Sequence, residues 1–133
     1  MVIDSSALLA VLLAEEDAPK FARTLEQANH CLMAAPTWLE TSILATSRKG
    51  PAGQQAFIEL VERMQVEIVP FDKGLANVAF NAWLRYGKGR HRAGLNLGDC
   101  FSYALAHQFG EPLLFKGADF SETDIIAAIS DTE

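Results

Sequence analysis

The chain has 133 residues, of which 50% are hydrophobic and 21% are charged, and its formal net charge is −6. This length and composition are typical of a single globular domain over residues 1–133, which can bury a core without disulfides or a structural metal. The acidic balance excludes indiscriminate binding to nucleic acids, because Lys and Arg side chains carry most of the affinity for phosphates.

The cysteines and the apolar runs indicate a soluble protein of the cytoplasm. Cys31 and Cys100 lie far apart and show neither a CxxC pattern nor a Cys/His spacing, so we expect two small buried side chains in a reducing compartment. Residues 7–14 form a short apolar run without a basic leader, which predicts a core helix rather than a signal peptide. No stretch approaches the roughly 20 apolar residues that cross a bilayer, so we expect no association with a membrane.

The first half of the chain alternates short apolar runs with amphipathic stretches. The expected elements are a strand at 1–3, a helix to residue 13, a helix at 18–27, a strand at 31–34 and a helix at 37–49. Pro36 and Thr37 open the last of these helices, and Glu40 lies three residues after Thr37. This spacing predicts a capping box with Thr37 as the N-cap.

The second half continues the alternation. The expected elements are a helix at 54–64, a strand at 66–69, a helix capped by Asp72, a polar loop at 87–96, a helix at 98–109, a strand at 112–115 and a short apolar segment at 125–129. Strands that alternate with helices in this way predict an α/β fold with a parallel sheet.

Four acidic residues lie at the ends of predicted strands or at the starts of helices. Asp4 follows the first strand and Glu40 lies in the first turn after the second. Asp99 opens the helix before the fourth strand, and Asp119 follows that strand. Because the carboxyl ends of strands in a doubly wound parallel sheet share one edge, we expect these side chains to converge.

A cluster of carboxylates repels itself and is costly to desolvate, so it persists only where a cation holds it together. Mg²⁺ and Mn²⁺ prefer oxygen ligands and keep several waters, and the sequence offers no companion set of His or Cys. Such an ion lowers the pKa of a bound water and stabilises charge on a phosphate and on its leaving oxygen. The pattern therefore indicates phosphodiester hydrolysis with Mg²⁺, or Mn²⁺ as a substitute.

Each acid also has a local structural explanation. Glu40 and Asp99 lie in first helical turns, where the helix dipole and free amides favour a negative charge. Asp119 fits a turn. Asp72 likewise follows a strand and precedes a helix, yet we assign it only a capping role. Asp4, which ends a buried strand, is the hardest to explain structurally.

Four segments carry a family pattern over nearly the whole chain: MVIDSSALLAVLL, APTWLETSILA, GRHRAGLNLGDCFSYALA and GEPLLFKGADFSETDI. In this order and spacing they resemble the PIN-domain ribonucleases, and within them the VapC-type toxins of type II toxin-antitoxin (VapBC) pairs. The resemblance implies a three-layer α/β/α fold with a parallel sheet of order 3-2-1-4-5. It also implies metal-dependent endonucleolytic cleavage of RNA.

The resemblance assigns a role to each matched residue. Asp4 and Asp99 would be the principal metal ligands, and Glu40 and Asp119 would complete the pocket directly or through water. Ser5 would orient Asp4 and its bound waters, and the pair Thr123 and Asp124 would support the pocket. Related sequences often carry Asn or Asp just before the last pocket acid, where this chain has Ala118, which leaves the metal preference open.

The resemblance also implies partners besides the RNA substrate. Family members of this kind pair with a small antitoxin whose C-terminal segment covers the active-site groove and often places a basic side chain in the acid pocket. They also commonly form homodimers. We therefore expect a VapB-like antitoxin and a second copy of the chain as partners.

The region just before the Asp99 helix is rich in cations. The candidates for guiding an RNA backbone to the metal are Arg85, Lys88, Arg90 and Arg92. An ordinary solvated loop is the alternative. Tyr86 and Phe120 could stack on unpaired bases, although we expect Phe120 in the core.

Two other functions remain open. A metal-dependent phosphohydrolase would use Asp4 as a nucleophile, but Ser6 stands where haloacid-dehalogenase-like phosphatases have their second acid. A catalytically silent PIN-fold binding module would need none of the four acids, yet all of them are present.

Overall fold

A computed structural model of the protein describes residues 1–129. Its centre is a sheet of short strands, β1 (Val2–Ile3), β2 (Leu32–Ala34), β3 (Glu67–Val69) and β4 (Leu113–Leu114). Their order is β3-β2-β1-β4 and every pairing is parallel. The chain runs outward from β1 to β2 and β3 on one side and to β4 on the other, so β1 and β4 meet at the switch point, as expected.

The fifth strand of the expected sheet is reduced to a single bridge. Residues 125–129 lie beside β4, where Leu113 forms an isolated parallel bridge with Ala127. The N–H of Leu113 donates to the carbonyl of Ile126, and the N–H of Ala128 donates to the carbonyl of Leu113, both at 2.9 Å. Because β4 has only two residues, it offers few backbone groups for a further strand. The expected order 3-2-1-4-5 is therefore corrected to four strands and a bridge.

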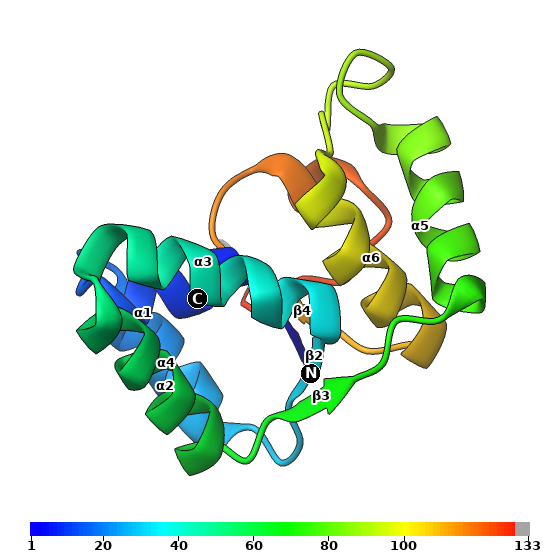
Figure 1. The fold of residues 1–133 in the computed structure, drawn as a ribbon. Helices are drawn as coiled ribbons and strands as arrows, with labels where there is room; N and C mark the ends of the chain where they lie inside the picture. Colours follow the sequence, from blue (N-terminus) through cyan, green and yellow to red (C-terminus); the bar gives the residue numbers. More distant parts are fainter. Residues whose placement is uncertain (130–133) are drawn as a thin grey trace.

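Helices cover both faces of this sheet, which gives the three layers of an α/β/α fold (Figure 1). They are α1 (Ser5–Leu12), α2 (Ala18–Gln27), α3 (Ala35–Lys49), α4 (Pro51–Arg63), α5 (Lys73–Tyr86) and α6 (Leu97–Phe109), and a short 3₁₀ helix, η1 (Asp119–Glu122), follows β4. Successive strand residues point to opposite faces. Val2 accordingly packs in the core with α5 and α6, whereas Ile3 packs in the core with α1, α2 and α4.

The start of α3 corrects one local prediction. The helix begins at Ala35 without a capping side chain, so Thr37 is not its N-cap and Glu40 does not complete a capping box. Pro36 in the first turn accounts for the earlier start, because that position needs no N–H and proline already has a helical φ. Glu40 therefore lies in the second turn of the helix.

The predictions for the Asp72 cap, the buried cysteines and Phe120 are confirmed. The carboxylate of Asp72 caps α5 by accepting the N–H of Leu75 at 2.9 Å. Cys31 and Cys100 are each 3% exposed, and Phe120 is in the core at 2%. No helix of residues 1–129 combines the length and the apolar character needed to cross a membrane.

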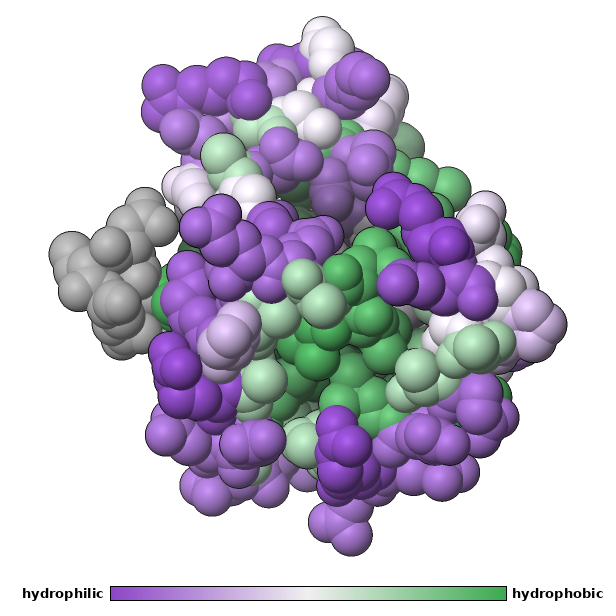
Figure 2. Space-filling view, turned by 90° about the vertical axis from the view of Figure 1, so that its left-hand side faces the viewer, coloured by the Kyte–Doolittle hydropathy of each residue, from purple (hydrophilic) through white to green (hydrophobic). Residues whose placement is uncertain are grey.

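Because the strands are short, the helices cover much of the core, and some apolar surface remains exposed to solvent. Figure 2 shows one face on which hydrophobic residues line a hollow and hydrophilic residues form its rim. Within residues 1–129, several large hydrophobic side chains of α3, α5 and α6 are also exposed, among them Leu39, Phe80 and Leu97. Surface of this kind is common where a partner binds.

Candidate active site formed by four carboxylates

Asp4 follows β1 directly and is enclosed, at 3% exposure. It is the N-cap of α1, because its Oδ2 accepts the N–H of Ser6 at 3.1 Å and the hydroxyl of Ser6 at 2.6 Å. Its Oδ1 accepts the hydroxyl of Ser102 in α6 at 2.5 Å. Two hydroxyl groups from different helices therefore fix both carboxylate oxygens.

Glu40 reaches the same region from α3. Its Oε1 accepts the hydroxyl of Ser5 at 2.9 Å. We expected Ser5 to orient Asp4, but its hydroxyl binds Glu40 instead. The Glu40 carboxylate packs against Gly98 at the start of α6, where any Cβ would collide with Oε2. Burial, and to a lesser degree the charge of Asp4, raise the pKa of Glu40, although the Ser5 hydroxyl opposes the rise.

Asp99 lies in the first turn of α6 and forms a capping box with Asn96. The N–H of Asp99 donates to Asn96 Oδ1 at 2.9 Å, and Asp99 Oδ2 accepts the N–H of Asn96 at 3.1 Å. Burial raises the pKa of Asp99 to about 7 despite the latter bond, and the charges of Asp4, Asp119 and Glu40 add to the rise. Charges influence one another in this way only at short range, so the four acids face one region.

Asp119 opens η1 on the loop that leaves β4, and it is exposed. It is therefore the outermost of the four acids. The Lys and Arg side chains that form ion pairs within residues 1–129 pair with other carboxylates; for example, Lys116 Nζ lies 2.7 Å from Glu15 and 3.0 Å from Asp17. In this part of the chain no Lys or Arg ion pair compensates the charge of the four acids.

The oxygens of this region suit a hard divalent cation, although they are not arranged around one. No group of three His, Cys, Asp or Glu side chains in residues 1–129 could hold a metal ion as it stands. Ser5 engages Glu40 and Asn96 engages Asp99. A carboxylate has about four lone-pair sites, so these hydrogen bonds leave acceptor capacity for a cation. The chemistry of the donors therefore fits Mg²⁺ or Mn²⁺.

Thr123 and Asp124, the predicted supporting pair, lie at the edge of the site. The hydroxyl of Thr123 donates to the carbonyl of Phe120 at 2.7 Å and so closes the turn of η1. Asp124 accepts the hydroxyl of Tyr103 at 2.7 Å and lies 3.7 Å from Arg85 Nη1. Through these contacts the pair holds the segment after Asp119 against α5 and α6.

The other predicted RNA-binding cations lie in the loop at 87–96. Arg92 Nε lies 2.8 Å from Glu122 Oε2, which ties the loop at 87–96 to η1. The guanidinium of Arg90 lies 5.0 Å from the ring centroid of Trp83. Lys88 is exposed. Two of the four cations, Arg85 and Arg92, thus also hold the structure of the region.

The structure adds Ser102 and Gly98 to the residues expected from the sequence. Ser102 lies three residues after Asp99, a spacing that places both on one face of a helix. Gly98 directly precedes Asp99, where a glycine permits close approach of another group. Both features are visible in the sequence, but neither shows that Ser102 contacts Asp4 or that Gly98 contacts Glu40.

Comparisons with known proteins identify the family of the chain. The PIN domain family matches residues 1–126. Ribonuclease VapC30 of Mycobacterium tuberculosis is 47% identical over 125 residues, which are 94% of this chain and 95% of that protein. The chain belongs to the PIN domain family, and within it to the VapC ribonucleases.

Two solved structures share the fold. VapC20 of Mycobacterium tuberculosis, described as a sarcin-ricin loop cleaving toxin, has a TM-score of 0.78 at 17% identity, covering 94% of this chain and 95% of that one. A toxin-antitoxin complex from Klebsiella pneumoniae has a TM-score of 0.72 at 15% identity, covering 96% and 97%. At these identities the likeness concerns the fold alone.

Removing the charge of Asp99 should stabilise the metal-free protein at neutral pH. The pKa of Asp99 rises from its usual 3.8 to about 7 in the folded state, so folding binds a proton between these values and stability falls as the pH rises through them. In EDTA, Asp99→Asn should therefore melt at a higher temperature than the wild type at about pH 8, with a difference that shrinks towards about pH 4. Scanning calorimetry over this range measures it.

The exposed cap Asp72 provides the matched control, because Asp72→Asn makes the same chemical change at an acid that is not among those raising the pKa of Asp99. It should show no gain in melting temperature at high pH. A wild type as stable as Asp99→Asn at about pH 8 would contradict the raised pKa of Asp99, to which burial contributes most and the charges of the other three acids less.

Proposed function

We propose that the protein is a metal-dependent endoribonuclease that acts as the toxin of a toxin-antitoxin pair and uses Mg²⁺, or Mn²⁺ as a substitute. The observation that carries this proposal is that Asp4, Glu40 and Asp119 lie close enough to Asp99 for their charges to help raise its pKa, while no Lys or Arg of residues 1–129 forms an ion pair with any of the four. The name of the relative at 47% identity, a ribonuclease, supports the reaction class.

Each of the four acids has a distinct part in the proposed reaction. A divalent cation held here would supply an activated water and would stabilise charge on an RNA phosphate. Asp4 and Asp99 would be its principal ligands, since each is fixed in place by hydrogen bonds from neighbouring residues. Glu40 and Asp119 complete the oxygen set, and exposed Asp119 lies on the side from which a substrate can approach.

A phosphohydrolase with Asp4 as nucleophile is the less favoured alternative. A nucleophilic carboxylate needs one oxygen that is free to attack. Both oxygens of Asp4 accept hydroxyl hydrogen bonds, from Ser6 and Ser102, and the residue is buried. These hydrogen bonds suit a carboxylate that is held as a ligand. A catalytically silent binding module is tested by the cleavage assay itself.

Replacing the principal ligands should abolish metal-dependent cleavage of RNA. Asp4→Asn and Asp99→Asn each remove a negative charge that would hold the cation, so each should lower kcat/KM on a structured RNA by at least about 100-fold. Asp72→Asn should cleave like the wild type, because Asp72 only caps α5. Gel electrophoresis of products formed with Mg²⁺, with Mn²⁺ and with EDTA gives the comparison. Equal cleavage in every lane would indicate a contaminant and would remove the metal mechanism.

We also propose that the loop at 87–96 guides the RNA backbone towards the acids. Phosphates need local cations near an acidic site, and the loop lies between α5 and the helix that carries Asp99. Lys88 and Arg90 are the best probes, because Arg85 and Arg92 also form ion pairs that hold the loop.

The double variant Lys88→Ala with Arg90→Ala should bind RNA more weakly. The half-saturation concentration should rise, and the slope of log affinity against log salt should become shallower by about one unit for each phosphate that the protein no longer neutralises. Filter binding at several salt concentrations measures both. Arg63→Ala is the control, because Arg63 ends α4 just before β3 and so lies near the opposite edge of the sheet. An unchanged salt slope would remove the loop from the binding site.

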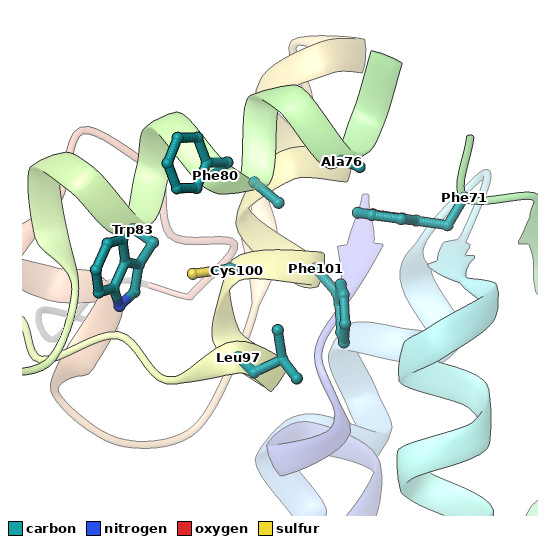
Figure 3. Close-up of a pocket in the computed structure, with 8 residues that line it drawn as sticks. Phe71, Ala76, Phe80, Trp83, Leu97, Cys100 and Phe101 are labelled. Atoms are coloured by element: carbon teal, nitrogen blue, oxygen red, sulfur yellow. The ribbon is translucent and has the colours of Figure 1, made fainter. Parts of the chain in front are cut away.

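A groove between α5 and α6 is the proposed seat of the antitoxin. It has a volume of about 450 Å³, and Figure 3 shows Phe80 and Trp83 of α5 with Leu97 and Phe101 of α6 along its walls. Leu97 and Phe101 also line a neighbouring hollow that reaches Glu40. A partner with apolar side chains in the groove and a basic side chain beyond it would therefore meet the acids. The fold likeness to a chain of a solved toxin-antitoxin complex supports an antitoxin as partner, without bearing on where it binds.

A charge placed in this groove should weaken the complex with a VapB-like antitoxin. Phe80→Asp should raise the dissociation constant at least about tenfold, because it introduces an unpaired charge at an apolar interface. Phe109→Asp is the matched control, since Phe109 is 51% exposed against 58% for Phe80 but ends α6 away from the groove lining. Calorimetric titration compares the two, and equal affinities would place the antitoxin elsewhere.

A homodimer is the remaining proposal about partners. It would need an apolar surface, and α3 offers Leu39 and Ile43, which are 55% and 58% exposed and which also line the hollow that reaches Glu40. Light scattering of the purified protein, alone and with the antitoxin, measures the number of copies.

A further inference from the structure

Both oxygens of the Asp4 carboxylate are held by hydroxyl groups that come from different parts of the fold. Ser6 of α1 donates to Oδ2 at 2.6 Å, and Ser102 of α6 donates to Oδ1 at 2.5 Å. The Ser6 hydroxyl in turn accepts the N–H of Lys116, on the loop after β4, at 3.0 Å. Three segments far apart in the sequence therefore converge on the orientation of one side chain.

Ser102 differs from an ordinary helical serine in the acceptor of its hydroxyl hydrogen bond. A Ser or Thr inside a helix commonly donates back to the carbonyl four residues earlier. Thr41 of α3 does so, with the carbonyl of Thr37 as its acceptor at 2.7 Å. Ser102, which is 1% exposed, instead donates its hydroxyl hydrogen to Asp4, which lies 98 residues away in the sequence. Its hydrogen bond is thus with the site rather than with its own helix.

We infer that Ser102 is a positioning residue of the active site, which fixes the Asp4 carboxylate so that Asp4 and Asp99 present their oxygens to the same cation. The inference rests on the proposed metal-dependent function. Asp99 and Ser102 lie one turn apart on α6, so a single rigid helix supplies one ligand and orients the other. Hydrogen bonds that orient metal ligands commonly change metal affinity or activity 10- to 100-fold when they are removed.

A merely structural role would give a different outcome. If Ser102 only satisfied a buried carboxylate, its replacement would lower the melting temperature but leave metal affinity unchanged in molecules that are folded. Metal affinity and stability must therefore be measured separately on the same variants.

The experiment is a calorimetric titration of each metal-free protein with Mn²⁺ alone, at a temperature where circular dichroism shows it to be folded. Ser102→Ala should raise the dissociation constant about tenfold. Ser102→Thr keeps the hydroxyl but adds a methyl group at a buried position, so it should bind Mn²⁺ more tightly than Ser102→Ala although it melts at a lower temperature than the wild type. A hydroxyl group that restores Mn²⁺ affinity without restoring the stability of the wild type is what a positioning role predicts.

Ser42→Ala is the matched control. Ser42 is also a buried serine in a helix, but its hydroxyl has no hydrogen-bond partner among residues 1–129. It should bind Mn²⁺ like the wild type. If Ser102→Ala does not fold, Ser102→Cys replaces it, because a thiol has similar size but is a weak donor and should also raise the dissociation constant.

Two results would overturn the inference. Equal Mn²⁺ affinity of the wild type and the Ala or Cys variant at position 102 would remove the positioning role and leave the proposed nuclease intact. Equal affinity of the Thr and Ala variants would do the same, because the hydroxyl would then make no difference. A wild type that binds no Mn²⁺ and cleaves RNA no better than Asp4→Asn would instead overturn the proposed function together with the inference.

Discussion

Electrostatic repulsion among four carboxylates in a partly buried region is the constraint around which the rest of this structure is arranged. Asp4, Glu40, Asp99 and Asp119 come from separate elements, and burial together with the charges of the other three acids raises the pKa of Asp99 to about 7. Such a cluster is unfavourable unless it is stabilised by donors or cations. Within residues 1–129 the donors are neutral: hydroxyl groups of serines and backbone amides at the starts of α1 and α6.

Because these donors are neutral, the same carboxylate atoms can serve both the fold and the proposed metal site. Asp4 caps α1 and Asp99 takes part in the capping box of α6, so each acid stabilises the helix that positions it. A helix N-terminus offers partial positive charge without a compensating full charge. A Lys or Arg at these positions would cancel the negative charge and leave little attraction for a divalent cation. The local structural explanation of these acids is therefore not an alternative to the proposed function but a condition for it.

The sequence predicted the parts of the site that depend on strand ends and missed those that depend on tertiary contacts. Parallel strands place Asp4 and Asp119 near one edge, and this follows from alternation alone. The hydrogen bond from Ser102 to Asp4 joins residues 98 positions apart, and no local pattern encodes it. The same holds for the ion pair between Arg92 and Glu122, which makes a predicted RNA-binding cation part of the loop structure. The cap predicted at Thr37 was wrong because Pro36 allows α3 to start earlier, a competition between two local signals.

The proposed substrate and the proposed antitoxin would bring charges of opposite sign to the same four acids. RNA is an anion, so a divalent cation between the acids and a phosphate would have to offset their mutual repulsion before RNA could approach the four acids. A basic side chain of an antitoxin would need no such ion, because it would neutralise the carboxylates directly. The apolar hollow beside Glu40 would hold the rest of such a partner without any contribution from phosphates. The metal and the antitoxin would thus each compensate the same negative charge of the four acids. Binding of one in the pocket would exclude the state that the other stabilises.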